Sequence, residues 1–409
     1  MTKMIHRIVL VLSVFFVFSC TTEGQKLGVL EVSETAGLDR PIEYVAVEII
    51  LDGEISPDKC IAIVGAERPV AIKGQVTKQK NLKDKYVYKL LFPVKVRANE
   101  VEKYSVEMVA EASLPHRLYV EGEGLEITVE NGIYKADLRS VHFGKDNEIG
   151  PGQLGSLTIK DGNVSLKRKD LKIHWAPNFQ KKGLDYKTHG HIRQYDSIGI
   201  VKGEYMTSVY REGHVPGYEE IKIYTQYDFY SGLPYFEFYS KMEMRDSVRL
   251  EMLRNDEMTL DSLFTHLVYY SDKDKLANQI RLYDNDDLNK LKVSPIETNA
   301  KWLLFCNKKL GYALGSVRLD HNISNESGFE SPTFDSRTWI TKSKNGGRYW
   351  DRRFLHGASL NIPKGSQYQE RNAYVVLTSN VDEMALEMTA LENRLKNPLI
   401  VKYRSLGEE

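Results

Sequence analysis

Histidine, tyrosine and arginine side chains gather in one stretch of the chain, residues 188–214. Its residues with titratable or cationic side chains include His189, His191, Arg193, Asp196, Tyr205, Tyr210, Arg211 and His214. Elimination at a uronic acid linkage needs a base for the ring proton, a donor for the leaving oxygen and a cation for the sugar carboxylate. His and Tyr suit the proton transfers, and the planar fork of Arg suits the carboxylate. The pattern favours catalysis by His189, His191 and Tyr210, with Arg193 as a substrate contact.

The spacing of the two histidines allows other interpretations. Residues i and i+2 of a strand point to the same side, so His189 and His191 would share a face on which a metal ion can bind. Asp196 or His214 would be a third ligand, but the sequence does not fix one. We therefore predict no cofactor and leave a divalent metal open. The remaining interpretation is a surface loop whose histidines make ordinary hydrogen bonds.

A second group of polar residues, Arg254-Asn255-Asp256-Glu257, interrupts an apolar, alternating region. Four consecutive polar residues there require that some point inward or line a cleft, and a buried charge has to be paired or used. Arg254 is a candidate to bind a substrate carboxylate, and Glu257 or Asp256 is a candidate acid or base. The alternative is a structural network in which the arginine and the carboxylates close a loop between strands.

Tryptophan and arginine recur on a Gly-rich segment further along the chain. It comprises Arg337-Thr338-Trp339 and Gly346–Arg353, with His356 beyond it, and His174-Trp175 is a candidate for the same surface. Aromatic faces stack on the apolar faces of sugar rings, while neighbouring arginines bind hydroxyls or carboxylates. The predicted substrate contacts are Trp175, Arg193, Tyr349, Trp350 and Arg352. Packing at a strand edge with solvated arginines is the alternative.

Strands must position these residues. The chain contains 24 tyrosines, and its apolar and polar residues alternate as in half-buried strands. Asn131-Gly132 predicts a hairpin, and so does Ser231–Pro234 between Ile221–Phe229 and Tyr235–Met244. Only Val381–Leu395 has the apolar period of a helix. We therefore predict an all-β protein with a short C-terminal helix.

Two groups of segments carry a resemblance to a known family. The first comprises Gly37–Pro41, Val45–Val47, Gln75–Val76 and Leu91–Val94, and the second is Leu125–Tyr134. Together they look like the galactose-mutarotase-like supersandwich preceded by a small β-domain. Such modules occur in polysaccharide lyases, in some glycoside hydrolases and in lipoproteins of glycan-degrading gut bacteria. The resemblance implies a carbohydrate-active protein, but the fold alone does not choose among lyases, hydrolases, epimerases and binding modules.

The strand pattern and the resemblance together divide the chain. We predict a signal peptide at residues 1–19 and a lipidated tether at residues 20–27. A small N-terminal β-sandwich would follow at residues 28–115, and a large antiparallel β-supersandwich at residues 116–409.

The N-terminus has the regions of a secretory signal, because a positively charged start precedes the apolar run Ile8–Phe18. That run is shorter than the roughly 20 residues of a membrane-spanning helix. Val17-Phe18-Ser19-Cys20 resembles the lipobox of lipoprotein signal peptidase, which makes Cys20 the predicted lipidation site; an ordinary signal peptide is the alternative. Thr21 stands where inner-membrane lipoproteins commonly have Asp. We therefore predict an outer-membrane anchor, at the periplasmic face or the cell surface.

Charge and cysteine content narrow the classes of partner. The full chain has 56 basic and 56 acidic residues, so loss of Lys3 and Arg7 with the signal leaves 54 basic and 56 acidic residues. This balance argues against a nucleic-acid partner. Cys60 and Cys306 have no metal-site spacing, and we expect two isolated thiols rather than a disulfide. Motifs of serine hydrolases, zinc proteases, P-loop proteins and Rossmann enzymes are absent from the sequence.

Three functions remain open at this point. The first is cleavage of an acidic polysaccharide or oligosaccharide by β-elimination, through His189, His191, Tyr210, Arg254 and Glu257. The second is non-catalytic glycan binding by the aromatic and arginine residues. The third is glycoside hydrolysis, in which Glu257 would pair with Asp256 or Asp351 across a cleft.

Overall fold

The computed structural model describes residues 24–65, 70–83, 85–142, 148–168, 171–260, 263–271, 276–283, 293–296, 300–333, 337–342 and 347–406. Antiparallel strands dominate it, which confirms the all-β fold class. The described residues contain a single α-helix, α2 (Val381–Lys396), at the position that the apolar period predicted. The signal peptide and Cys20 lie outside the described residues. No described helix has the length and apolar character needed to cross a membrane.

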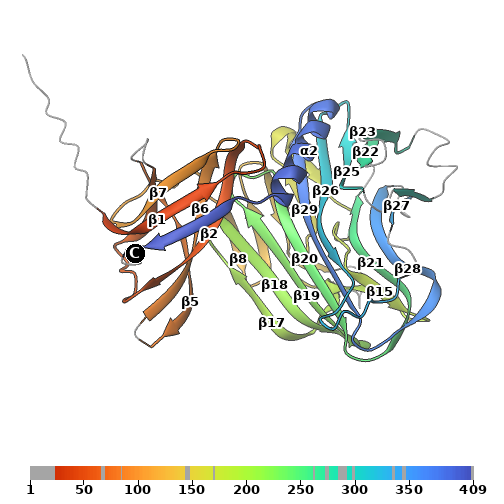
Figure 1. The fold of residues 1–409 in the computed structure, drawn as a ribbon. Coiled ribbons are helices and arrows are strands. Elements are labelled where there is room, and N and C mark those ends of the chain that lie inside the picture. The colour runs from red at the N-terminus through yellow and green to blue at the C-terminus, as the bar shows by residue number, and fades with distance from the viewer. Residues whose placement is uncertain are drawn as a thin grey trace, which may run out of the picture.

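The N-terminal part is a small sandwich of two sheets (Figure 1). One sheet has the order β30-β1-β7-β3-β4, and its strands are β1 (Gln25–Ser33), β3 (Cys60–Gly65), β4 (Ala71–Lys73), β7 (Val101–Val109) and β30 (Ile400–Ser405). The other sheet has the order β2-β6-β5, with β2 (Arg40–Leu51), β5 (Gln75–Leu82) and β6 (Lys85–Val96). The last strand of the chain, β30, therefore lies in the N-terminal sandwich, where it pairs with β1.

The large part is built on two main sheets among the described residues. The nine-stranded sheet has the order β17-β18-β19-β20-β29-β26-β25-β22-β23, with β17 (Gln194–Val201), β18 (Met206–Val215), β19 (Tyr218–Tyr230), β20 (Tyr235–Met244), β22 (His266–Ser271), β23 (Leu276–Arg281), β25 (Trp302–Asn307), β26 (Tyr312–Asn322) and β29 (Gln367–Thr378). The six-stranded sheet has the order β16-β15-β21-β28-β27-β24, with β15 (Asn178–Lys181), β16 (Lys187–Thr188), β21 (Val248–Leu260), β24 (Val293–Ile296), β27 (Thr338–Lys342) and β28 (Arg348–Ile362).

Smaller elements fill in around these two sheets. A five-stranded sheet has the order β14-β13-β10-β9-β8, with β8 (Tyr119–Glu123), β9 (Glu126–Glu130), β10 (Tyr134–Asp137), β13 (Ser156–Ile159) and β14 (Val164–Leu166). The remaining described elements are β11 (Val141–His142), β12 (Glu148–Ile149) and the 3₁₀ turns η1 (Asp161–Asn163) and η2 (His189–His191).

Both predicted hairpins form. At Asn131 the side-chain oxygen accepts hydrogen bonds from the backbone N–H groups of Ile133 and Tyr134, at 2.8 and 2.9 Å. The Asn131 amide also donates to the carbonyl of Leu233, at 2.9 Å. Leu233 belongs to the turn that joins β19 to β20. The side chain of Asn131 therefore connects the turn at Asn131–Gly132 to this second turn.

Buried polar side chains divide the core between the two main sheets. On β19, Ile223 belongs to one apolar cluster and Tyr227 to another, and Thr225 lies between them. The same order recurs on the neighbouring strands; on β28, Arg352 separates Trp350 from Phe354. We call the buried polar side chains at this level the polar belt: His189, Arg211, Thr225, Ser240, Asn255, Asp256, Ser316, Arg318, Arg352, Glu370 and Asn372.

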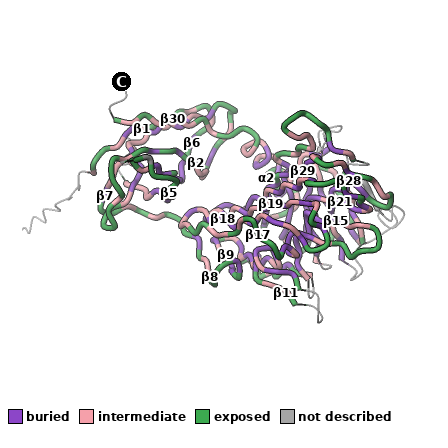
Figure 2. The backbone as a smooth tube through the Cα atoms, turned by 90° about the horizontal axis from the view of Figure 1, so that it is seen from below, coloured by how far each residue is buried: buried purple, intermediate pink, exposed green. Residues whose placement is uncertain are grey.

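Helix α2 covers part of the outer face of the nine-stranded sheet (Figure 1). Its buried residues Met384, Met388 and Leu391 pack against apolar side chains that include Val317 and Val375. The chain then leaves the helix and returns to the N-terminal sandwich as β30. Figure 2 shows the two parts side by side, with β30 and β1 on the N-terminal part.

Candidate functional site

A β-bulge in β21 organises the polar residues of the six-stranded sheet. Asn255 pairs with Arg352 and Met258 with Trp350 on β28, so Asp256 and Glu257 together face the single residue Asp351. Asp256 has a positive φ of 46°, a conformation that Asp tolerates better than most residues. Regular alternation would have placed Asp256 on the same face as Arg254. The bulge instead directs Asp256 between the sheets, and bulges and strained residues of this kind cluster at functional sites.

On the inner side of the bulge, Asp256 accepts three hydrogen bonds. The Ser316 hydroxyl donates at 3.0 Å, the Trp350 indole N–H at 3.0 Å and the Tyr374 hydroxyl at 3.3 Å. Burial and the nearby charge of Glu370 raise the pKa of Asp256 to about 6. This carboxylate therefore joins β21 and β28 of one sheet to β26 and β29 of the other.

The hydrogen bonds continue from Tyr374 through a buried histidine. Because the Tyr374 hydroxyl donates to Asp256, it accepts from Nε2 of His174, at 3.1 Å. Nδ1 of His174 then accepts from the Tyr227 hydroxyl, which itself accepts from the backbone N–H of Leu154 at 3.3 Å. Burial lowers the pKa of His174 to about 3. A neutral His174 imidazole with its proton on Nε2 can make all of these hydrogen bonds.

On the outer side of the bulge, one guanidinium contacts two carboxylates. Nη1 of Arg254 lies 3.5 Å from Glu257 Oε2, and Nε lies 3.1 Å from Asp351 Oδ2. Glu257 also accepts from the Asn178 amide at 2.7 Å, and Asp351 accepts from Nε of Arg353 at 2.7 Å. Burial lowers the pKa of Arg254, but the two carboxylates outweigh burial and raise it overall. Burial raises the pKa of Glu257, against the effect of Arg254.

Two tryptophans on this outer side lie beneath arginines. The guanidinium of Arg168 is 5.3 Å from the ring centroid of Trp175, and those of Arg337 and Arg353 are 5.1 and 5.4 Å from that of Trp339. We call this outer surface the arginine face: Arg168, Trp175, Asn178, Arg254, Glu257, Arg337, Trp339, Tyr349, Asp351, Arg353 and His356. This face brings four arginines, Arg168, Arg254, Arg337 and Arg353, together with the carboxylates of Glu257 and Asp351. Burial lowers the pKa of His356.

Several buried polar atoms of the arginine face have no hydrogen-bond partner among the described residues. They include the indole nitrogens of Trp175 and Trp339, Oδ1 of Asn178 and Oδ1 of Asp351. Buried polar groups are usually paired with protein or water. Donors and acceptors are thus available on this face to a polar ligand or to ordered water.

Comparison with known proteins supports the architecture. No family model and no curated protein sequence matches the chain. Among solved structures, an α-mannosidase from Enterococcus faecalis V583 is similar with a TM-score of 0.52 and 10% identity, over 93% of this chain and 46% of that one. A protein of glycosyl hydrolase family 38 from Enterococcus faecalis is similar with a TM-score of 0.51 and 10% identity, over 94% and 49%. The chain spans about half the length of these structures, and such low identity shows the fold alone.

The structure does not assemble the proton-transfer set predicted in residues 188–214. His189 and His191 lie in the turn η2 rather than in a strand, and with three residues per turn they do not share a face. His189 is buried against Thr225, and burial holds its pKa well below the usual range. Nδ1 of His191 accepts from the backbone N–H of Thr188, and burial lowers its pKa to about 4. Tyr210 lies on the outer face of the nine-stranded sheet, opposite to its buried neighbour Arg211.

The predicted substrate contacts are divided between faces. Trp350 and Arg352 point between the sheets and are 0% and 4% exposed, which leaves no surface of the Trp350 ring for a solute. Asp351 lies between them in the sequence and points to the arginine face, because neighbouring residues of a strand point to opposite faces. Trp350 and Arg352 therefore point the other way, between the sheets. Trp175 and the half-exposed Tyr349 lie on the arginine face, but Trp175 is only 4% exposed, which leaves its ring no surface for stacking. Arg193 is exposed, and its guanidinium donates to backbone carbonyls, among them that of Glu148 at 2.8 Å.

Asn178 had not been identified as a candidate from the sequence, and His174 had been named only together with Trp175 as part of a sugar-binding surface. Asn178 pairs with Arg254 across β15 and β21, and this contact depends on strand register, which no local pattern specifies. The sequence His174–Asn178 carries three polar or aromatic residues in a short apolar context, and this is the only local signal.

The sequence left a divalent metal site open and predicted two isolated thiols. The described residues contain no group of three or more His, Cys, Asp or Glu side chains that could hold a metal ion. Cys60 and Cys306 are both free thiols; Cys306 is buried and Cys60 half-buried.

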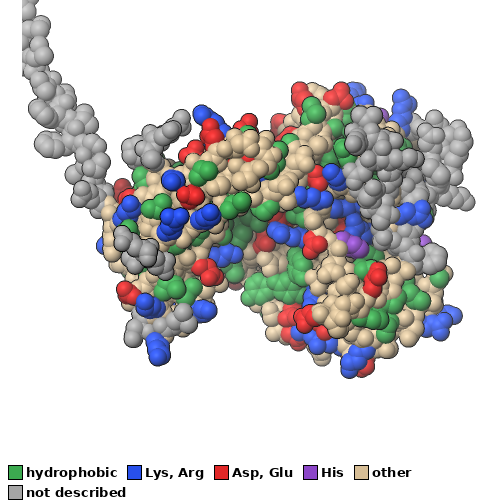
Figure 3. All heavy atoms as spheres, viewed as in Figure 1, with side chains coloured by type: hydrophobic (Ala, Val, Ile, Leu, Met, Phe, Trp, Pro, Cys, Tyr) green, Lys and Arg blue, Asp and Glu red, His purple; other side chains and the backbone are tan. Residues whose placement is uncertain are grey.

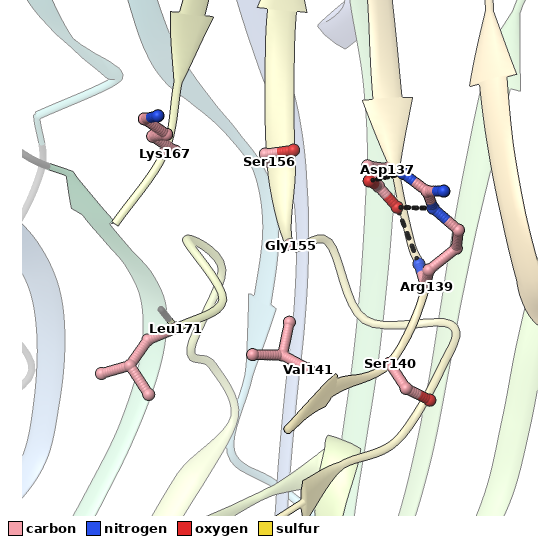
Figure 4. Close-up of a pocket in the computed structure, with 8 residues that line it drawn as sticks. All are labelled: Asp137, Arg139, Ser140, Val141, Gly155, Ser156, Lys167 and Leu171. Carbon is pink, nitrogen blue, oxygen red and sulfur yellow. Dashed lines mark hydrogen bonds and ion pairs between the residues drawn. The ribbon is translucent and has the colours of Figure 1, made fainter. Parts of the chain in front are cut away.

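A surface pocket lies near the five-stranded sheet (Figure 4), away from the bulge. Its lining includes Asp137, Arg139, Ser156 and Lys167. Asp137 and Arg139 bind one another, with Nη2 2.6 Å from Oδ2, and Figure 4 shows Lys167 well apart from this pair. The one carboxylate of the pocket lining is therefore already paired with Arg139.

Proposed function

We propose that this protein binds carbohydrate and that the arginine face holds an acidic saccharide. The observation that supports it most is the group of arginines beside the partly exposed rings of Trp339 and Tyr349. Guanidinium groups bind carboxylates with directed hydrogen bonds, and aromatic rings stack on sugar faces. The similar structures include an α-mannosidase, which is compatible with a carbohydrate ligand.

Cleavage by β-elimination has less support from the geometry. It requires a base that reaches the sugar, whereas His189 is 0% exposed. For this reason we place binding before elimination.

Glycoside hydrolysis is the second candidate, because two carboxylates meet at Arg254. The raised pKa of Glu257 is what a general acid needs, and Asp351 is its acidic neighbour. Both carboxylates are buried, so hydrolysis would require the site to open. Release of reducing ends from an acidic oligosaccharide, abolished by Glu257→Gln, would favour hydrolysis over binding alone.

Affinity electrophoresis tests the binding proposal. Polygalacturonate or alginate in the gel should retard the protein, whereas neutral dextran should do so less. Arg254→Lys and Tyr349→Ala should each weaken retardation by the acidic polymers. Arg249→Gln should not, because Arg249 is an exposed residue of β21 whose guanidinium donates to the Ser359 hydroxyl. Equal retardation of all four proteins would refute the proposal, as would the absence of retardation by any acidic polymer.

We further propose that Cys20 carries the lipid that anchors the protein to the outer membrane. The lipobox-like Val17–Cys20 supports this proposal. Expression in a bacterial host with a radiolabelled fatty acid should label the wild type and not Cys20→Ala. Labelling of both, or of neither, would overturn it.

A further inference from the structure

A row of side chains crosses the outer face of the nine-stranded sheet, on the opposite side of the molecule's core from the arginine face. Tyr210 on β18 pairs with Gln226 on β19, Gln226 with Tyr239 on β20, and Tyr239 with Arg371 on β29. We call these four residues the tyrosine row. Neighbouring strands are about 4.8 Å apart, so the backbones of Tyr210 and Tyr239 are about 10 Å apart. Both tyrosines are half-exposed.

The ring of Tyr210 lies over a glycine of the next strand. A Cβ atom added to Gly199 would lie 2.7 Å from the Tyr210 hydroxyl oxygen and 3.0 Å from Cζ. Gly199 lies inside β17, where glycine weakens a strand and where no left-handed backbone requires it. The glycine thus provides room for the hydroxyl end of the Tyr210 ring, and the Tyr210 side chain stays half-exposed.

Polar contacts hold the rest of the row in place. The Gln226 amide donates to both oxygens of Asp228 at 2.9 Å and accepts from the Tyr224 hydroxyl at 2.5 Å. The rings of Tyr224 and Tyr239 are 5.8 Å apart. Side chains that are already ordered lose less entropy when they bind a ligand.

The charges around the row differ from those of the arginine face. Arg371 donates to Glu237 at 2.8 Å, and Asp228 adds a second carboxylate beside the row. These three residues leave no surplus of positive charge. A saccharide without carboxylates suits this surface better than an acidic one.

Strands β18 and β19, which carry part of the row, border a recess between the two parts of the protein (Figure 1). The N-terminal sandwich contacts this sheet at one end, where the Tyr44 hydroxyl donates to the Ser231 carbonyl at 2.8 Å and Gln75 donates to the Met206 carbonyl at 3.0 Å. Figure 3 shows the surface hollowed between the two parts, with hydrophobic side chains in the depth of the hollow. Figure 2 shows the parts diverging from their contact.

We propose that the tyrosine row is a second saccharide site, which binds a neutral oligosaccharide by stacking on Tyr210 and Tyr239. Arg371 and Asp228 then provide hydrogen bonds to sugar hydroxyls. The proposal depends on the proposed function for its ligand class, but it uses different residues and a different sugar charge. It also gives Tyr210 a binding role in place of the proton transfer expected from the sequence.

Calorimetric titration with neutral oligosaccharides of glucose, mannose, galactose and xylose tests this proposal. At least one should bind, and Tyr210→Ala and Tyr239→Ala should each weaken its binding by about tenfold, which corresponds to about 1.4 kcal/mol. Tyr210→Phe should keep most of the affinity, because the ring remains. Gly199→Val should weaken binding by displacing the ring. Tyr119→Ala is the matched control, since Tyr119 is an exposed tyrosine on β8.

The outcomes separate the two proposals. Loss of neutral-sugar binding in the tyrosine variants, with no effect of Arg254→Lys, supports the second site. Absence of binding by all neutral oligosaccharides, or equal binding by Tyr210→Ala and wild type, overturns it even where acidic polymers bind the arginine face. Failure of acidic polymers alone overturns only the arginine-face proposal. Preference of the row for acidic sugars would refute the charge argument.

Discussion

The hydroxyl of Tyr374 on β29 donates to the carboxylate of Asp256 on β21, at 3.3 Å, and so links the two main sheets through a buried charge. On the far side of the same hydroxyl lies His174. Asp256 is the one acidic residue of β21 that the bulge places in the polar belt. Because burial of a charge opposes folding, the protonation of this residue should be visible in stability.

The stability contributed by Asp256 should depend on pH. Its folded pKa is raised to about 6 by burial and by Glu370, so the folded state binds the proton more tightly than the unfolded state. Stability should therefore rise as pH falls from about 6 to about 4 and be lost as pH rises through 6. Asp256→Asn removes the titration, and the difference between wild type and variant should change by on the order of 2–3 kcal/mol across this range. Urea unfolding at several pH values measures it, and a constant difference would contradict the assignment.

Arg254 should be more important for stability than its exposure suggests. Removal of the guanidinium leaves Glu257 and Asp351 as buried charges, each with one contact fewer. Breaking a buried ion pair from one side typically costs about 3–5 kcal/mol. Arg254→Met should therefore destabilise strongly, and the triple variant with Glu257→Gln and Asp351→Asn should recover much of the loss. Arg249→Ala should change the free energy of unfolding by less than about 0.5 kcal/mol.

That experiment also distinguishes the two interpretations of Arg254 from the sequence. If the triple variant is as stable as the wild type but no longer binds acidic polymers, the network serves binding. If stability falls in the triple variant to the level of Arg254→Met, the carboxylates are not the reason for the arginine.

Features set by local patterns were predictable, whereas features set by register were not. The hairpin at Ser231–Pro234 and the helix at Val381–Leu395 follow from turn residues and from apolar periodicity, and both form. The opposite directions of Asp256 and Arg254 follow from a bulge that the sequence does not reveal. Four consecutive polar residues correctly indicated that part of the group is buried, but not which part.

The interpretation in which His189 and His191 share one face of a strand was wrong for a related reason. The prediction of a shared face assumed a strand at His189–His191, but the chain turns there as η2. Gly190 allows this turn to pack closely, since a Cβ at this position would lie 2.0 Å from the Gln153 side-chain oxygen. The contact comes from a segment far away in the sequence, so no local pattern could indicate it.

The ionised carboxylate of Glu34 should stabilise the N-terminal sandwich at neutral pH and lose this effect in strong acid. Its carboxylate accepts from the backbone N–H groups of Gly37 and Asn99, at 2.8 and 3.0 Å, and pairs with Arg40 at 3.2 Å. Although burial opposes the charge, these bonds lower the pKa of Glu34 to about 2. The contribution is present above the ordinary Glu range and is lost as pH falls through about 2. Glu34→Gln should lower the free energy of unfolding at pH 7 and have little effect near pH 2; an equal loss at both would contradict this.

The last strand of the chain, β30, should contribute to the stability of the N-terminal sandwich. Strand β30 pairs with β1 from Gly28 with Ser405 to Ser33 with Ile400, and Val401 packs on the N-terminal core. Arg40 also donates to the carbonyl of Arg394 at 2.9 Å, which holds the end of α2 to β2.

Truncation after residue 397 should expose the edge of β1 and remove this packing. We expect a loss of at least about 2 kcal/mol, the value of one large buried apolar side chain, together with faster proteolysis within β1. A peptide of residues 398–409 added in excess should restore part of the protection, because it can pair with the open edge. Hydrogen exchange at the β1 amides measures both effects. Unchanged protection of β1 in the truncated protein would mean that β30 only covers an edge that is stable without it.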